Sequence, residues 1–335
     1  MKLYLILLTA AVVIVLAKDA VTLAFAPFVL ITLGFYVLIK GADVLVEGSV
    51  AIAERMGVSK LFIGLSLVAI GTSAPEFAVS LASAIKGVGG IAVSNVVGSN
   101  VANISLCLGV TLLFGNLTVK NTTKKVEIPF LVLVSLSFFA MLLRRKPATI
   151  DWNDGIVLLS IFAIYTYYLM NMAKSDMEEL EKEENIDVKR AITMVVSGLI
   201  GVALGGDMTV DSIVEIAKMF HLSNSLFALT VVAVGTSLPE LVTSITAANK
   251  GHTDLSVGNI VGSNIMNILL IIGVSSIVGK RLVVDVNMYW IDATFLLFTS
   301  AVLAVMAAKG NLKRYDGAIL LAIYVSYISF VLWRR

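Results

Sequence analysis

The sequence has few of the residues that soluble proteins use for surfaces, disulfides and metal sites. Only 14% of its 335 residues are charged, whereas 58% are hydrophobic, and the mean hydropathy is +0.95. So few polar groups cannot cover a water-facing surface, which excludes a soluble domain. The single cysteine, Cys107, excludes an internal disulfide, and the two histidines, His221 and His252, lack a partner at metal-ligand spacing. A net charge of +2 scattered through the loops offers no surface for nucleic acid.

Long apolar runs separated by short charged segments fill most of the chain. Each run is near the roughly 20 residues that a helix needs to cross a bilayer, and none alternates like a barrel strand. We predict an all-α multi-pass protein of the cell membrane. Its expected spans lie near residues 3–24, 26–46, 60–85, 91–114, 127–143, 154–171, 191–217, 222–248, 255–278, 287–307 and 315–333.

Two segments stand apart from the regular spans. Residues 1–25 fit either a cleaved signal peptide or an extra N-terminal transmembrane helix. Residues 172–190 form the one long polar stretch, and they lack the spaced Asp and Asn with a central Gly of a calcium-binding loop. We interpret 172–190 as an acidic cytoplasmic linker between two halves, 26–171 and 191–335.

A gapless internal repeat carries most of the information. Residues 68–115 align with residues 232–279, so each residue of the first stretch pairs with the residue 164 positions later. Pro75 pairs with Pro239 and Glu76 with Glu240 in this register, which low complexity among apolar residues would not produce. At about 30 residues for a span and its loop, 164 residues hold about five helices. An odd number of spans inverts the second copy, and inverted repeats place transporter sites at the bilayer midplane.

Two carboxylates, Glu76 and Glu240, lie inside these apolar spans. An ionised carboxylate there costs at least a few kcal/mol unless a cation compensates it, and no Lys or Arg lies in the repeat cores. A proline precedes each glutamate and frees carbonyls near residues 69–72 and 233–236. The neighbouring hydroxyls belong to Thr72, Ser73, Thr236 and Ser237. Such a set of hard oxygen donors is typical of Ca²⁺ sites and accepts Na⁺.

A second motif follows in each copy, Gly98-Ser99-Asn100-Val101-Ala102-Asn103 and Gly262-Ser263-Asn264-Ile265-Met266-Asn267. Its Ser and Asn are four residues apart and share one helical face, which Asn95 and Asn259 extend by a turn. We expect Gly98 and Gly262 to permit close helix approach, although small polar residues can also serve helix packing alone. The repeat also pairs Asp43 with Asp207, which we interpret as caps or interface contacts near span ends.

The motifs GTSAPE with GSNVAN, and GTSLPE with GSNIMN, resemble the paired alpha repeats of the sodium/calcium exchanger branch of the calcium/cation antiporter superfamily. The resemblance covers most of residues 26–335. It implies a ten-helix core of two inverted five-helix repeats, with the second and seventh helices broken around the ions. It further implies an antiporter rather than an enzyme, whose partners are Ca²⁺, Na⁺ and the lipid bilayer, with no cofactor, nucleic acid or obligatory protein partner.

The resemblance also implies roles for the matching residues. Glu76, Glu240 and the backbone carbonyls of Thr72 and Thr236 would bind Ca²⁺. The flanking Na⁺ sites would use Ala69, Ser73, Ser99, Ala233, Ser237 and Ser263, with Asn103 and Asn267 at the centre. Asn267 argues against K⁺ coupling, because some relatives, including those that resemble potassium-dependent exchangers, carry Asp there. Two carboxylates neutralise one Ca²⁺ but leave one charge with three Na⁺, so the expected exchange is electrogenic.

Three alternatives remain open on the sequence. A proton/calcium exchanger is the nearest, because buried glutamates can release protons, although such relatives typically carry Asn at the positions of Ser73 and Ser237. A passive channel is disfavoured, because a deep carboxylate cage binds divalent ions too firmly for fast permeation. An intramembrane hydrolase is disfavoured because neither HExxH nor GxSxG occurs.

Overall fold

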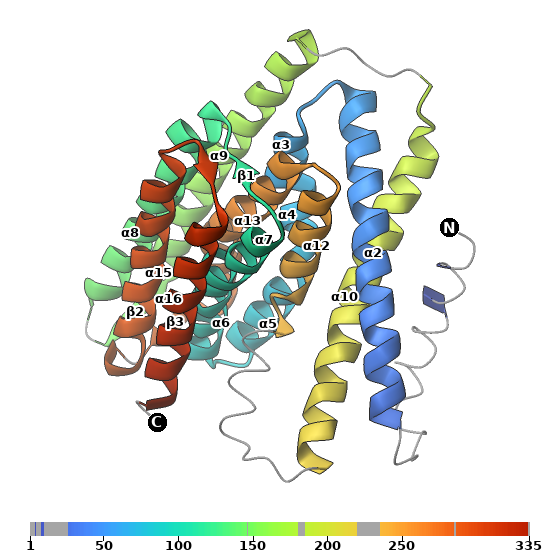
Figure 1. Cartoon of the computed structure of the whole chain (residues 1–335). Helices are drawn as coiled ribbons and strands as arrows, with labels where there is room; N and C mark the ends of the chain where they lie inside the picture. The colour runs from blue at the N-terminus through green and yellow to red at the C-terminus, as the bar shows by residue number, and fades with distance from the viewer. Residues whose placement is uncertain are drawn as a thin grey trace.

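The computed structural model describes residues 4, 8–9, 26–145, 147–179, 185–219, 235–284 and 286–333. Most of these residues are helical (Figure 1). Within them, eight helices are long and apolar enough to cross a membrane, and one further bent pair of helices passes the same criteria. The prediction of an all-α polytopic membrane protein is therefore confirmed.

The first half contains α2 (Ala26–Met56), α3 (Lys60–Ile63), η2 (Gly64–Val68), α4 (Ala69–Thr72), α5 (Ala74–Ile85), α6 (Gly89–Ala102), η3 (Asn103–Cys107), α7 (Leu108–Phe114), β1 (Leu117–Thr118), η4 (Thr123–Glu127), α8 (Ile128–Leu143), β2 (Ala148–Asp151) and α9 (Trp152–Glu179). The second half contains α10 (Val188–Met219), α12 (Leu238–Asn249), α13 (Thr253–Met266), η5 (Asn267–Ile272), α14 (Gly273–Val278), β3 (Arg281–Val284), α15 (Val286–Ala307), β4 (Asn311–Leu312) and α16 (Arg314–Trp333). The segments marked η are π-helical turns that continue into their neighbours.

The span over residues 60–85 is broken where the sequence predicts it. The chain bends by 48° between residues 60–72 and α5. Ser73 leaves the helical region at φ −83° and ψ 8°, because Pro75 has no amide to continue the hydrogen-bond ladder. Ser237 starts α12 in almost the same conformation, at φ −91° and ψ 4°. The other half of that counterpart span, together with Ala233 and His221, lies outside the described residues.

Two short antiparallel sheets show that the second repeat is inverted. β1 pairs with β4, and β2 pairs with β3. The spanning helix that ends in α8 separates β1 from β2, so the two sheets lie at opposite ends of the bundle (Figure 1). β1 and β3 begin at Leu117 and Arg281, which are 164 residues apart. Equivalent strands of the two repeats therefore lie at opposite ends, as inversion requires.

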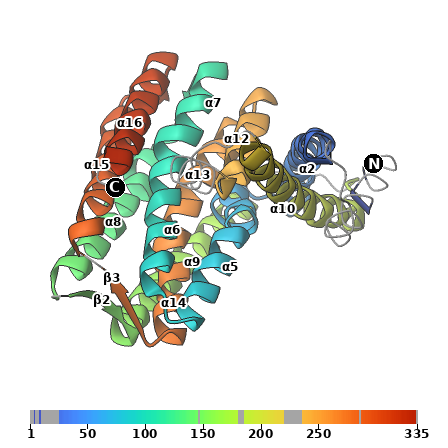
Figure 2. The same cartoon turned by 90° about the horizontal axis from the view of Figure 1, so that it is seen from below.

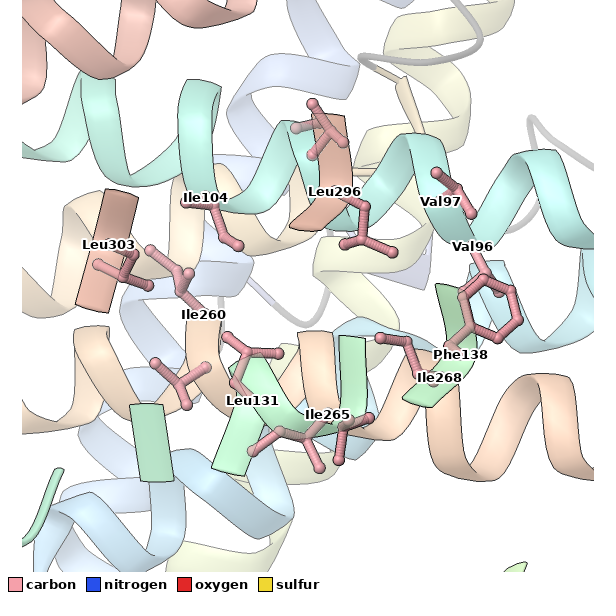
Figure 3. Close-up of a cluster of buried hydrophobic side chains, with 14 of the residues drawn as sticks. Val96, Val97, Ile104, Leu131, Phe138, Ile260, Ile265, Ile268, Leu296 and Leu303 are labelled. Carbon is pink, nitrogen blue, oxygen red and sulfur yellow. The ribbon is translucent and has the colours of Figure 1, made fainter. Parts of the chain in front are cut away.

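The core lies where the second motifs of the two repeats pass each other. The helices from α6 to α7 and from α13 to α14 are the most deeply buried spans in the described chain. Figure 3 shows Val97 and Ile104 from the first of these near Ile260 and Ile268 from the second. Leu131 and other side chains of α8 and α15 close the cluster from outside. This packed centre fixes the helices that carry the polar motifs.

α2 and α10 form a separate pair beside this core, as both views show (Figures 1 and 2). Glycines spaced by seven bring their backbones together, as is common between membrane helices. A Cβ added at Gly41 would lie 2.7 Å from Val202 N, and one at Gly205 would lie 2.4 Å from Leu38 N. These two glycines are equivalent in the repeat. The contact leaves no room for a side chain, so the two helices are held as one unit.

We expect Gly205→Ala to destabilise the protein by about 1–3 kcal/mol, the usual cost of overpacking a closely packed contact. The added methyl group would force α10 away from the backbone of α2 at Leu38. Thermal unfolding of purified protein in detergent, read by loss of the monodisperse peak in fluorescence-detected chromatography, measures the effect. Gly115→Ala is the matched control, because an added Cβ there meets nothing within 4 Å. Equal melting temperatures for the two variants would contradict the packing described here.

The structure corrects several expectations. Asp43 and Asp207 lie inside the long helices α2 and α10 rather than near span ends, and neither caps a helix. Asp43 does make an interface contact, because Lys250 Nζ lies 3.4 Å from its Oδ1. The start of the expected linker continues α9, where Asp176 accepts a hydrogen bond from Ser59 N at 2.9 Å. Gly262 packs closely on Leu65 and Ala69 as predicted.

Other expectations fall partly outside the described residues. Gly262 lies against Leu65 and Ala69, so the offset of 164 makes residues 229 and 233 the corresponding partners of Gly98. The structure does not describe these two residues, and the prediction for Gly98 stays a prediction. Of the first segment it describes Tyr4, Leu8 and Thr9, and the Tyr4 hydroxyl donates to Ser197 O at 2.6 Å.

Candidate cation site

The two broken-helix motifs meet the two GSN motifs at the centre of the core. The loops of the breaks, at Ser73 and Ser237, lie against the helices that begin at α6 and α13. Each of those helices widens into a π-helical turn that starts at the repeat-related Asn103 or Asn267. Such π-turns are frequent at functional sites because they redirect a side chain and loosen backbone hydrogen bonds.

Glu76 is fully buried at the start of α5. Ser99 Oγ donates to its Oε1 at 3.3 Å, and Thr236 of the other repeat also hydrogen-bonds to its carboxylate. Ser99 Oγ lies 3.5 Å from Thr236 Oγ1, so the two hydroxyls come together from different repeats. The second oxygen, Oε2, is buried and has no hydrogen-bond partner among the described residues.

Glu240 has a closely related environment at the start of α12, and it is also fully buried. Ser73 Oγ donates to its Oε1 at 3.0 Å, and the hydroxyls of Thr72 and Ser263 lie beside the same carboxylate. Ser263 Oγ further lies 3.5 Å from Thr72 Oγ1 and donates to Ala69 O at 3.5 Å. Oε2 of Glu240 is again buried without a hydrogen-bond partner. Each carboxylate is therefore held through one oxygen and presents the other.

Asn95 and Asn259 hold the broken helices against the GSN helices. Asn95 Nδ2 donates to Glu76 O at 3.1 Å and to Ser80 Oγ at 2.9 Å. Asn259 Nδ2 makes the repeat-related bonds to Glu240 O at 3.5 Å and to the hydroxyl of Ser244 at 3.0 Å. Both asparagines use their donors on the backbone of a glutamate and so fix where its side chain starts.

Four further asparagines on these helices are fully buried: Asn100, Asn103, Asn264 and Asn267. Asn100 Nδ2 donates to Asn264 O at 3.0 Å, and Asn267 Nδ2 donates to Asn100 Oδ1 at 2.9 Å. Asn267 Oδ1 is left as a buried acceptor without a partner. The amide groups of Asn100 and Asn267 thus join the two repeats.

The backbone at the first break offers another acceptor. The amides around it bond to the carbonyls of Ala69, Gly71 and Ser73. Within the described residues, the Thr72 carbonyl has no amide partner. A carbonyl left in this way beside a buried carboxylate is a suitable ligand for a hard cation.

The chemistry of this donor set is that of a hard cation rather than a transition metal. The described residues contain no group of three or more His, Cys, Asp and Glu that could hold a metal ion. Instead, two carboxylates are surrounded by hydroxyl, amide and carbonyl oxygens. No ion pair within the described chain involves either glutamate, so their charge must be balanced by protons or by bound cations.

The structure brings most of the predicted residues together. Hydrogen bonds link these residues in three groups: Thr72 with Ser263 and the Ala69 carbonyl, Ser73 with Glu240, and Glu76 with Ser99 and Thr236. Asn103 and Ser237 are linked through Cys107, whose Sγ lies 3.7 Å from Asn103 Oδ1 and 3.6 Å from Ser237 O. Ala233 is outside the described residues.

Sequence reasoning missed two contributors. Cys107 is a buried member of the apolar core, and its thiol also contacts polar groups of the site. Asn100 joins the repeats through Asn264 and Asn267, and its pairing with Asn264 at the same offset of 164 was the available signal.

A cavity of about 90 Å³ leads to the site from one side. It is lined by Pro75, Ala203, Gly206, Asp207, Val210, Asp211, Gly235, Thr236 and Pro239. It therefore lies between α10 and the breaks of both broken helices, and it reaches Thr236 beside Glu76. Nothing in the sequence indicated that Asp207 lines this cavity.

Comparison with known families gives a match over both halves of the chain. The sequence profile described as "Sodium/calcium exchanger protein" matches residues 26–171 and 190–333. The chain is 31% identical over 289 residues to inner membrane protein YrbG of Escherichia coli, covering 83% of this chain and 88% of that protein. It is 29% identical over 314 residues to sodium/calcium exchanger MaX1 of Methanosarcina acetivorans, covering 82% and 89%.

A solved structure shares the whole architecture. The sodium-calcium exchanger NCX_Mj, soaked with Na⁺ and Sr²⁺, superposes with a TM-score of 0.80 at 30% sequence identity, and the match covers 92% of this chain and 99% of NCX_Mj. Its description concerns extracellular ion exchange and occlusion of the binding site.

Proposed function

The chain belongs to the sodium/calcium exchanger protein family, and we propose that it exchanges Na⁺ for Ca²⁺ across the cell membrane. Members of this family are transporters of cations, so the chain is a cation antiporter rather than an enzyme. The choice of cations rests on the pair of buried glutamates. Within the described residues, each has one carboxylate oxygen without a hydrogen bond, and neutral oxygen donors surround it. The relatives named for sodium and calcium exchange support the same choice.

We propose that Ca²⁺ binds between Glu76 and Glu240 and uses the carbonyls of Thr72 and Thr236 as further ligands. Two carboxylates together with neutral carbonyl oxygens suit Ca²⁺, which takes six to eight oxygens in a flexible geometry. Na⁺ would replace it, using the hydroxyls of Ser73, Ser99, Ser237 and Ser263, the carbonyls of Ala69 and Ala233, and the amides of Asn103 and Asn267. Both cations compete for the same two carboxylates, so binding of one excludes the other, as antiport requires.

Three Na⁺ for one Ca²⁺ is the proposed stoichiometry, without K⁺. Two carboxylates neutralise one Ca²⁺, whereas the same pair with three Na⁺ carries one net positive charge. K⁺ is left out because the residue at the centre is Asn267, which adds no third carboxylate. Access would alternate by movement of the α2–α10 pair across the packed core.

Radiolabelled Ca²⁺ uptake into proteoliposomes tests the function. We expect vesicles loaded with Na⁺ to take up Ca²⁺ when diluted into Na⁺-free buffer at clamped pH. Vesicles loaded with K⁺ should take up little, because K⁺ is not the proposed counter-ion. A pH gradient without Na⁺ is the control for the nearest alternative, a proton/calcium exchanger, in which the same carboxylates would carry protons. Uptake that follows the pH gradient and ignores Na⁺ would overturn the proposal in favour of that alternative.

A further inference from the structure

Three charged positions outside the cation site recur in both repeats. Lys250, Asp43 and Glu47 correspond at the offset of 164 to Lys86, Asp207 and Asp211. We call the first three the Lys250 set and the second three the Lys86 set. The lysine of each set follows a broken helix, and the two acids lie one turn apart on α2 or α10.

The Lys250 set forms ion pairs in this structure. Lys250 Nζ lies 2.7 Å from Glu47 Oε1 and 3.4 Å from Asp43 Oδ1. The contact joins the end of α12 to the middle of α2, and the two helices pack along each other. Ala42 and Val46, on the same stretch of α2, are fully buried. This side of the molecule is closed.

The Lys86 set is arranged differently. Lys86 is exposed, and no ion pair within the described chain joins it to Asp207 or Asp211. α5 and α10 make little contact, whereas their counterparts α12 and α2 are packed together. Asp207 and Asp211 instead line the cavity that leads to Thr236. Within the described residues, the contact that corresponds to the one between Lys250 and α2 is therefore not made on this side.

The difference does not come from the local geometry of the two lysines. Lys86 N bonds to Ala82 O at 3.1 Å, and Lys250 N bonds to Thr246 O at the same distance. A glycine with positive φ follows each lysine, at 74° for Gly87 and 79° for Gly251. Both lysines are therefore held alike on their own helices. What differs is the position of the α2–α10 pair relative to the core.

The close glycine contacts make the two sets mutually dependent. Because α2 and α10 are joined at Gly41 and Gly205, they must move together past the core. A shift that brings α10 against α5 takes α2 away from α12. The repeat then predicts that a contact of Lys86 with Asp207 and Asp211 replaces the observed contact of Lys250 with Asp43 and Glu47.

We propose that Lys86, Asp207 and Asp211 are positioning residues that form, in a second state, the ion pairs that the Lys250 set makes in this one. Only one set is formed at a time. Each set holds one side of the cation site closed while the other side is open. The inference rests on the proposed function, because an exchanger must open its ion site first to one side of the membrane and then to the other.

Cysteine cross-linking of the full-length chain in membranes tests the proposal. Cys107 is fully buried in this state, and the variants with one introduced cysteine serve as the control for cross-links to it. A short bifunctional thiol reagent should cross-link both E47C/K250C and K86C/D211C, as detected on gels after proteolysis between the two sites. E47C/K86C is the matched control, which combines one member from each set and should not react. In the variant with all four cysteines, cross-linking of one pair should prevent cross-linking of the other in the same molecule.

Two outcomes would overturn the proposal. One is that K86C/D211C never cross-links at any Na⁺ or Ca²⁺ concentration while the variant still transports. The other is that both pairs cross-link in one molecule. Cross-linking is read without transport, so exclusive cross-links in a protein that shows no Na⁺-driven Ca²⁺ uptake would defeat the proposed function and leave this inference standing.

A charge exchange provides a second measurement should the cysteine variants fold poorly. We expect K86E to slow exchange about fivefold, the upper range of a partly exposed ion pair, and K86E/D211K to restore most of the rate. K250E and K250E/E47K should behave in the same way. Failure of both double variants to recover, with normal protein levels, would mean that these charges do not meet.

Discussion

Replacing Glu76 by Gln is expected to reduce Na⁺-driven Ca²⁺ uptake by at least about 30-fold, which corresponds to the 2 kcal/mol or more that loss of one member of a buried charge pair costs. The amide keeps the size of the side chain and can still accept the hydrogen bond from Ser99. It removes half of the negative charge that faces the cation. The same result is expected for Glu240→Gln, because its carboxylate is held by Ser73 in the equivalent way. Initial uptake rates in proteoliposomes measure both effects.

Glu127→Gln is the matched control for these variants. Glu127 is also a fully buried carboxylate in a membrane-spanning helix, but it lies in η4, away from the site, where Tyr168 hydroxyl donates to its Oε1. Its substitution should leave the dependence of uptake on Na⁺ unchanged. If Glu76→Gln moved Ca²⁺ at the rate of the unmodified protein, the two-carboxylate site would be wrong. Equal losses in Glu76→Gln and Glu127→Gln would point to folding rather than to ion binding.

The second large effect expected is on the response to membrane potential. An exchange of three Na⁺ for one Ca²⁺ moves one net charge, and one charge crossing 100 mV corresponds to about 2.3 kcal/mol. The equilibrium Ca²⁺ ratio should therefore change about 50-fold per 100 mV, at about 1.4 kcal/mol for each factor of ten. The potential can be set with a K⁺ gradient and valinomycin, and the Ca²⁺ ratio at steady state read with an internal indicator. The proposed independence of K⁺ makes this clamp usable.

The sign of the effect is also determined. When Na⁺ leaves the vesicle in exchange for Ca²⁺, one net positive charge leaves with each cycle, so an inside-negative potential should oppose uptake and an inside-positive potential should favour it. A Ca²⁺ ratio that is independent of potential would contradict a stoichiometry of three to one and indicate an electroneutral exchange of two monovalent cations per Ca²⁺. Vesicles without valinomycin serve as the control for direct effects of K⁺.

Several parts of the site could be predicted because the repeat fixes their positions along the sequence. Glu76 and Glu240 are costly in an apolar span, so their presence at one register in both copies indicates a compensating cation. Pro75 and Pro239 predict where each helix breaks, since the missing amide acts locally. The inverted arrangement follows from the length of the repeat, and the strand pairing bears it out.

The contacts between the repeats could not be predicted in the same way. Ser73 reaches Glu240 across 167 positions of the chain, and Ser99 meets Thr236 across 137. Cys107 belongs to the apolar core but also reaches Ser237 O across 130 positions. Each of these contacts depends on how helices from different halves cross, and helix periodicity does not encode the crossing.

The sequence by itself determined a membrane protein of two inverted copies with a buried glutamate in each, because burial cost, proline chemistry and the repeat register act through residue identity alone. The tertiary structure decided which hydroxyls and amides meet around those glutamates. It also decided that Lys250 pairs with α2 while Lys86 is exposed and Asp207 and Asp211 line a cavity. Because the two halves of the sequence carry equivalent charged positions, the sequence predicts ion pairs at Lys250 and at Lys86 equally. Only the position of the α2–α10 pair against the core distinguishes the two arrangements.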